Sequence, residues 1–143
     1  MVDRQGILEH LREMEASLQD WERYAATLSY EEMRKDRDKR NMALHAMLVA
    51  IQSAIDAASH LVAQNKLRRP SSYREGFEIL AEAEVLPSEM AQKLADLAGF
   101  RNVLVHIYWR LNLEEAFAIL QGGSMVLRSY LEYVKGLLAE EGH

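Results

Sequence analysis

The 143-residue chain has no cysteine, so it can form neither a disulfide bond nor a thiolate zinc site. It has only two prolines and seven glycines, which leaves room for long helices. No consecutive apolar run reaches the roughly 18 residues that indicate a membrane span. The first residues, Met1 to Gln5, lack the apolar segment of a secretory signal. We therefore expect a cytoplasmic protein with no membrane association.

The composition is that of an ordinary globular protein with a modest acidic excess. Hydrophobic residues make up 49% of the chain and charged residues 27%. This balance, at this length, predicts one domain that spans residues 1–143. The net charge of -5 argues against a protein that coats nucleic acid nonspecifically, although it leaves a local basic cleft open.

Apolar residues recur at helical spacing along most of the chain, and no strand pattern or internal repeat is present. The stripes run over residues 7–28, 44–62, 90–97 and 113–138. The second stripe has a parallel one beside it, which predicts a central helix buried on more than one side. We expect an all-α protein, an up-and-down helical bundle of about five helices.

Side-chain capping signals mark where several of these helices begin. Three polar residues have a glutamate three positions later, the pattern of a capping box. These pairs are Ser29 with Glu32, Ser72 with Glu75, and Asn112 with Glu115. Within the last stripe, Gly122 and Gly123 can kink the helix, admit close packing or end it early.

Groups that can do chemistry concentrate in the stretch from Arg101 to Tyr108, which also holds Asn102 and His106. Arginine binds phosphate as a planar fork, and histidine transfers protons near neutral pH. On one unbroken helix Arg101 and His106 would lie about 140° apart, whereas Asn102 and His106 share a face. The first two converge if the helix ends near His106, or if two copies of the chain meet across a two-fold axis.

A structural interpretation of this stretch stays open beside the functional one. Arg101 can pair with an acidic neighbour while His106 merely ends a helix. The aromatic side chains of Tyr108 and Trp109 can stack on a base or pack against the bundle. No Glu-x-x-His pair occurs outside the last residues, Glu140 to His143, which disfavours a di-iron bundle. We expect no metal and no cofactor.

Basic residues form two further groups, from Arg34 to Arg40 and around Arg68, Arg69 and Arg74. Each group is either a solvated surface or a patch that steers phosphate groups. The sequence does not show whether the two groups adjoin.

The segment Arg101-Asn102-x-x-x-His106-x-Tyr108 resembles the signature of HepT-like toxins of the HEPN superfamily. The likeness extends over roughly residues 35–138. It includes the central helix around Ala54-Ile55-Asp56-x-Ala58-Ser59-His60-Leu61 and the segment Ser72-Tyr73-Arg74-Glu75-Gly76-Phe77. It also includes Val85-Leu86-Pro87 and Leu97-Ala98-Gly99-Phe100 in the same order.

This resemblance implies an all-α, HEPN-like bundle and a homodimer in which the two motifs face each other. It implies the toxin of a type VII toxin–antitoxin system, a metal-independent ribonuclease with Arg101 and His106 as catalytic residues and Asn102 in support. The partner would be an MntA-like minimal nucleotidyltransferase antitoxin that transfers AMP to Tyr108. Some HEPN nucleases have an acidic residue elsewhere in the cleft; the resemblance does not assign it, and Asp36 is a candidate.

Two other functions remain compatible with the sequence. One is a non-catalytic helical dimer that binds a nucleotide or a nucleotidyltransferase partner, which the acidic net charge favours. The other is a structural bundle in which Arg101 forms a buried ion pair, so that its loss lowers stability rather than activity.

Overall fold

The computed structural model describes residues 4–106 and 108–141, and this part of the chain forms seven α-helices, one 3₁₀ turn and no strand. The elements are α1 (Arg4–Thr27), α2 (Tyr30–Lys35), α3 (Arg37–Gln64), α4 (Tyr73–Glu82), α5 (Ser88–His106), η1 (Tyr108–Arg110), α6 (Leu113–Gly122) and α7 (Ser124–Glu141). The expected all-α class is confirmed. The expected number of helices was too low, because two of the expected helices, the one that begins after Ser29 and the last one, are each divided into two.

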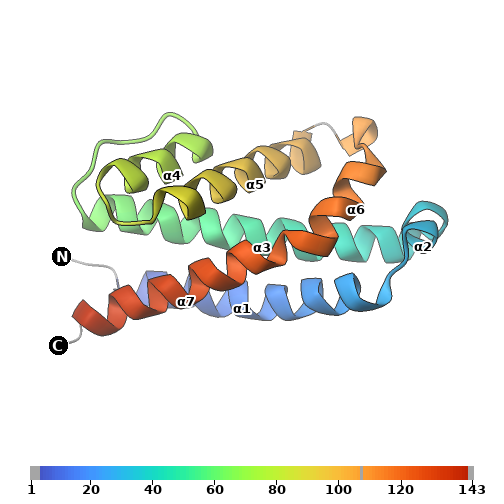
Figure 1. The fold of residues 1–143 in the computed structure, drawn as a ribbon, viewed down its shortest axis with the longest axis horizontal. Coiled ribbons are helices and arrows are strands. Elements are labelled where there is room, and N and C mark those ends of the chain that lie inside the picture. Colours follow the sequence, from blue (N-terminus) through green and yellow to red (C-terminus); the bar gives the residue numbers. More distant parts are fainter. Residues whose placement is uncertain (1–3, 107, 142–143) are drawn as a thin grey trace.

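The long helices run up and down along one axis of the molecule (Figure 1). Helix α1 packs along α3, and α7 lies against both of them. Helices α4 and α5 lie side by side over α3, while α6 approaches α2 at the far end of the bundle. The last residues of α5 are thereby held over the middle of α3, which is where the site described below is built.

Asp36 divides the helix that was expected to begin after Ser29. Its backbone N–H donates to the carbonyl of Glu32 at 2.8 Å and closes α2. Its side chain accepts a hydrogen bond from the backbone N–H of Lys39 at 3.1 Å and opens α3. The capping box at Ser29 and Glu32 is present as expected. Because Asp36 ends the helix that this box starts, that helix is only six residues long.

Gly123 divides the last expected helix, which carries the apolar stripe over residues 113–138, into α6 and α7. It caps the C-terminus of α6, and a Cβ atom placed on it would lie 2.8 Å from the carbonyl oxygen of Ile119 and 3.0 Å from the ring of Trp21. The fully buried indole of Trp21 donates to the carbonyl of Leu120 at 2.8 Å. Gly123 therefore lies at the end of α6, and its lack of a side chain lets Trp21 approach the backbone of that helix.

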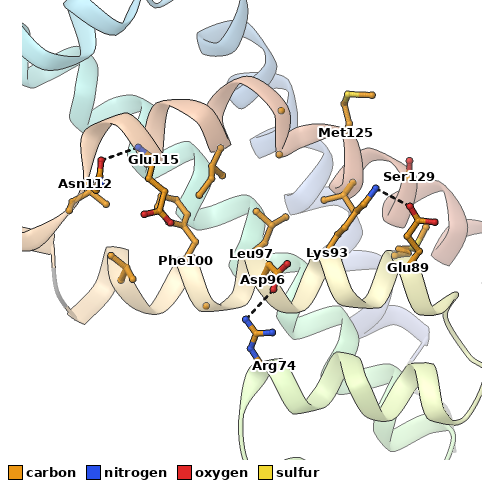
Figure 2. Close-up of a pocket in the computed structure, with 18 of the residues that line it drawn as sticks. Arg74, Glu89, Lys93, Asp96, Leu97, Phe100, Asn112, Glu115, Met125 and Ser129 are labelled. Carbon is orange, nitrogen blue, oxygen red and sulfur yellow. Dashed lines mark hydrogen bonds and ion pairs between the residues drawn. The ribbon is translucent and has the colours of Figure 1, made fainter.

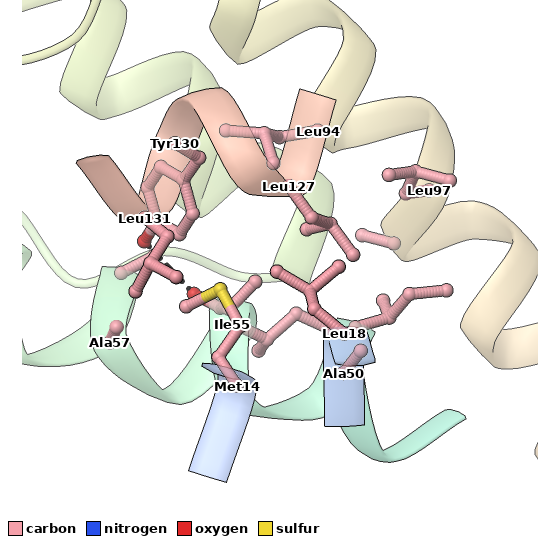
Figure 3. Packing of buried hydrophobic residues seen from close by; sticks show 14 of the residues in the cluster. Met14, Leu18, Ala50, Ile55, Ala57, Leu94, Leu97, Leu127, Tyr130 and Leu131 are labelled. Carbon is pink, nitrogen blue, oxygen red and sulfur yellow. Dashed lines mark hydrogen bonds between the residues drawn. The ribbon is translucent and has the colours of Figure 1, made fainter. Parts of the chain in front are cut away.

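The core is formed where α1, α3, α5 and α7 meet (Figure 3). Helix α3 is long and apolar enough to cross a membrane by composition, but 61% of its most apolar window is buried inside the bundle. Tyr130 of α7 is fully buried, and its hydroxyl donates to the carbonyl of Ala54 in α3 at 3.0 Å. The central position that the doubled stripe predicts for this helix is confirmed.

Candidate active site

The Arg101 motif lies at the end of α5, which stops at His106. Arg101, Asn102 and His106 all line one cavity of about 660 Å³. Its other walls come from the end of α3, from the loop that follows it, and from Tyr73 at the start of α4. From the sequence, Arg101 and His106 are expected to converge within one copy of the chain if the helix ends near His106. The helix does end there, and both residues line the same cavity.

Arg101 is half-buried and is held by uncharged groups. Its Nε donates to Oε1 of Gln52 at 2.7 Å, and one terminal nitrogen donates to Oδ1 of Asn102 at 3.1 Å. Its guanidinium carbon lies 5.0 Å from the centre of the Tyr73 ring, in cation–π contact. Among the described residues no carboxylate forms an ion pair with Arg101, so its positive charge is oriented but not neutralised. The alternative of a buried Arg–acid pair is therefore wrong for this part of the chain.

Gln52 connects Arg101 to a second polar group. Its amide nitrogen donates to Oδ1 of Asp56 at 2.9 Å, and Oδ2 of Asp56 lies 3.9 Å from Nδ1 of His10 on α1. The rings of His10 and His60 are 5.1 Å apart between centroids. The sequence gives no signal for this network, because its members lie on three helices. Asp56 has the hydrogen-bonded structural role expected of a polar residue in a central helix.

Asp36, the acidic candidate from the resemblance, is not at this site. It caps the start of α3, and Gln52 lies about 24 Å further along that helix at 1.5 Å per residue. Asp36 lines a different hollow with Glu31 and Glu32. Asp56 is instead the carboxylate tied to Arg101, through Gln52.

Asn102 and His106 are both exposed on the cavity side of α5. The carbonyl oxygen of the Asn102 side chain is occupied by Arg101, which leaves its amide N–H groups without a partner among the described residues. His106 makes no hydrogen bond within the described part of the chain. An imidazole and an amide donor thus stand free beside an oriented guanidinium, a set of groups that can bind a phosphodiester and transfer a proton.

The turn η1 spans Tyr108–Arg110, and its last two residues are exposed. The side chain of Tyr108 lies outside the described part of the structure. The next side chain, Trp109, is 78% exposed, so it does not pack against the described bundle. Arg110 closes the turn and lines a different cavity from that of the motif.

That second cavity, of about 1110 Å³, is the larger of the two and lies between α5 and the α6–α7 pair (Figure 2). It carries charges of both signs, including ion pairs from Lys93 to Glu89 at 3.4 Å and from Arg74 to Asp96 at 3.2 Å. None of Arg101, Asn102 and His106 lines it. The motif side chains and this larger cavity are therefore on different faces of α5.

Within the described residues, no group of three or more His, Asp or Glu side chains is arranged to hold a metal ion.

Two curated proteins are similar in sequence. The chain is 29% identical over 84 residues to the mRNA nuclease HepT of Shewanella oneidensis, and 31% identical over 84 residues to the tRNA nuclease HepT of Aphanizomenon flos-aquae. Each match covers 59% of this chain. The matches span 63% and 55% of the two relatives' own lengths.

A solved structure shows the same fold. The tri-AMPylated HEPN toxin of Shewanella oneidensis, in complex with MNT antitoxin, superposes with a TM-score of 0.83 at 21% sequence identity. The likeness covers 95% of this chain and 99% of that toxin.

The model of one protein family matches most of the chain. The model of the family described as ribonuclease HepT-like matches residues 14–134, a range that contains the whole cavity lining and the motif at the end of α5. This chain belongs to the ribonuclease HepT-like family.

Proposed function

We propose that this protein is the toxin of a type VII toxin–antitoxin system and acts as a metal-independent HEPN ribonuclease in the cytoplasm. The observation that carries the proposal is the convergence of Arg101, Asn102 and His106 on one open cavity, with the guanidinium oriented by uncharged partners. The curated relatives are named as nucleases of mRNA and of tRNA, which supports RNA as the substrate class. We take residues 1–143 as one domain with this activity.

The proposed reaction is a transesterification within RNA. The ribose 2′-hydroxyl attacks the adjacent phosphorus, the bond to the 5′-oxygen breaks, and a 2′,3′-cyclic phosphate forms. Arg101 binds the phosphate oxygens and stabilises the charge that gathers on them. His106 takes the proton of the 2′-hydroxyl or gives one to the departing 5′-oxygen. The free amide N–H groups of Asn102 add a donor to the phosphate.

A homodimer would supply the second proton-transfer group. With two copies facing each other across a two-fold axis, one His106 acts as the base and the other as the acid. The exposure of His106 and of its neighbour Val105, which is 43% exposed, supports an open face at this end of α5.

We further propose that an MntA-like nucleotidyltransferase silences the toxin by transferring AMP to Tyr108. The exposure of the next two residues, Trp109 and Arg110, supports this assignment, because a partner enzyme must reach this turn to modify it. The solved HEPN toxin with the same fold is tri-AMPylated and in complex with MNT antitoxin. The AMP that we propose on Tyr108 would bring a negatively charged phosphate to the motif and compete there with the RNA phosphate.

The test is cleavage of total RNA by the purified protein in the presence of EDTA. We expect the wild type to cleave and His106→Ala to lose cleavage while keeping the circular dichroism spectrum of the wild type. His45→Ala is the matched control, since His45 is an exposed histidine on α3 that does not line the cavity. Full activity of His106→Ala would remove His106 from the mechanism. RNA that is bound but not cleaved by the wild type would favour the non-catalytic binding function.

A further inference from the structure

The cavity that holds the motif differs in charge from the other hollows of this acidic protein. Its lining contains Arg69, Arg101 and His106 and no aspartate or glutamate. The lining of the larger cavity between α5 and α7 includes three acidic and three basic side chains, and the hollow on the other side of Arg101 includes Glu13 and Asp56. Of these three hollows, the motif cavity therefore has the lining that most favours an anionic ligand.

Three arginines lie close together in sequence, two in the loop after α3 and one at the start of α4, and they have different surroundings. Arg68 pairs with Glu75 at 3.6 Å and with Glu82 at 3.4 Å. Arg74 pairs with Asp96 at 3.2 Å. Arg69 forms no ion pair within the described residues, and of these three it alone lines the motif cavity. Of the three, the arginine that lines the cavity is the one without a carboxylate partner among the described residues.

The loop that carries Arg69 is anchored on both sides. Lys66 has φ of 55°, a left-handed conformation that turns the chain away from the end of α3. Pro70 restricts the backbone of Arg69 to extended conformations, and its ring lies next to Gly76 of α4, 3.8 Å from where a Cβ would stand. The backbone N–H of Ser71 donates to Glu75 at 2.7 Å. The base of the Arg69 side chain is thus held in place, which lowers the entropy cost of binding through it.

We propose that Arg69 is a second phosphate-binding residue of this site and binds the RNA backbone one phosphate away from the group held by Arg101. The inference rests on the proposed function, because it takes RNA as the ligand. Two cations from different elements that line one cavity suit a chain of phosphodiesters better than a single phosphate. The cavity volume of about 660 Å³ also exceeds what one phosphate group needs.

The experiment measures binding and does not depend on cleavage. The probe is a short fluorescein-labelled 2′-O-methyl oligoribonucleotide, which lacks the attacking hydroxyl, and its Kd is measured by anisotropy over a range of salt concentrations. Each phosphate contact on a single strand contributes about 0.7 to the slope of log Kd against log salt. We expect Arg69→Ala to bind more weakly and to lower that slope by about 0.7, and Arg69→Lys to keep it.

Arg68→Ala is the matched control, because it removes the same charge from the adjacent position outside the cavity. It should leave the slope unchanged. A slope for Arg69→Ala equal to that of the wild type, or a wild type that does not bind the probe, would overturn the proposal. An equal loss of affinity for free AMP would assign Arg69 to a mononucleotide and would also overturn it. Absence of RNA cleavage by a wild type that binds the probe would refute the ribonuclease activity alone.

Discussion

The Nε atom of Arg101 lies 2.7 Å from the side-chain oxygen of Gln52, a residue 49 positions earlier in the chain. The amide group of Gln52 has two ends and uses both: the oxygen accepts from Arg101, and the nitrogen donates to Asp56. The guanidinium is therefore oriented by a neutral group that is itself held by a carboxylate. Direct contact with that carboxylate would have cancelled the charge that a phosphate must meet.

Replacing Gln52 tests this support. We expect Gln52→Ala to lower kcat/KM for RNA cleavage by about tenfold or more, because a hydrogen bond to a charged group is worth about 1.5–3 kcal/mol. Gln52→Glu places a carboxylate directly on Arg101 and removes the amide that donates to Asp56, so it should lose activity as well. The measurement is initial-rate kinetics together with thermal unfolding, so that loss of positioning is separated from loss of fold.

The control for this variant is Gln92→Ala. Gln92 is a glutamine of α5 whose amide donates to Asp96 at 3.4 Å on the surface, away from Arg101. It should cleave RNA at the wild-type rate. Equal activity of Gln52→Ala and Gln92→Ala would show that Gln52 does not position the catalytic arginine.

Tyr108→Phe tests the proposed off switch. The phenylalanine variant lacks the oxygen that would accept AMP, so it should remain an active ribonuclease when the cognate nucleotidyltransferase, ATP and magnesium are present. Intact mass spectrometry should show AMP on the wild type and none on the variant. Tyr133→Phe, at an exposed tyrosine of α7, should still be modified. An adduct of undiminished mass on Tyr108→Phe would move the acceptor to another residue.

Gly123→Ala should destabilise the bundle. The added methyl group would lie 2.8 Å from the Ile119 carbonyl and 3.0 Å from Trp21, and overpacking of this kind costs about 1–3 kcal/mol. Gly136 in α7 has nothing within 4 Å of the same position. Gly136→Ala should therefore stabilise the helix by up to about 1 kcal/mol. Urea unfolding measures both changes, and opposite signs for the two variants are the expected result.

Tyr130 gives the fold a dependence on alkaline pH. Burial raises the pKa of its phenol above the ordinary value of about 10, so the folded protein keeps a proton that the unfolded chain loses. The free energy of unfolding should therefore fall as the pH rises above about 10. Tyr130→Phe should weaken this fall, at the cost of about 1 kcal/mol at neutral pH for the lost hydrogen bond to Ala54. Urea unfolding between neutral and alkaline pH, with Tyr133→Phe as the control, measures the difference.

Features encoded by neighbouring residues could be predicted from the sequence. The side chains of Ser29, Ser72 and Asn112 each accept a hydrogen bond from the residue three positions later, as the local pattern indicates. At Ser72 the return contact differs, because Glu75 accepts from the backbone of Ser71. The break at Asp36 was missed. The charged residues from Arg34 to Arg40 are compatible with one continuous helix, and nothing in them indicates that Asp36 ends one helix and begins the next.

The residues of the candidate site also fall into those that the sequence indicates and those that only the structure reveals. Arg101, Asn102 and His106 lie within six residues of one another, so their residue types marked one short stretch, and the family resemblance implied their roles. In the structure, all three line one cavity at the end of α5. Gln52 and Arg69 come from α3 and from the loop behind it. Their positions relative to Arg101 depend on how α3, α4 and α5 pack against one another. No pattern in a single sequence predicts which residues of different helices will come into contact.

The two tryptophans of this chain have opposite environments, one with no exposed surface and the other 78% exposed. Trp21 sits against the backbone of α6, so its fluorescence will follow the integrity of the bundle. Trp109 projects from η1, so an aqueous quencher will reach it first, and its emission will respond to events at the turn. Single Trp→Phe variants would thus give separate optical signals for unfolding and for docking of a partner, without an added dye.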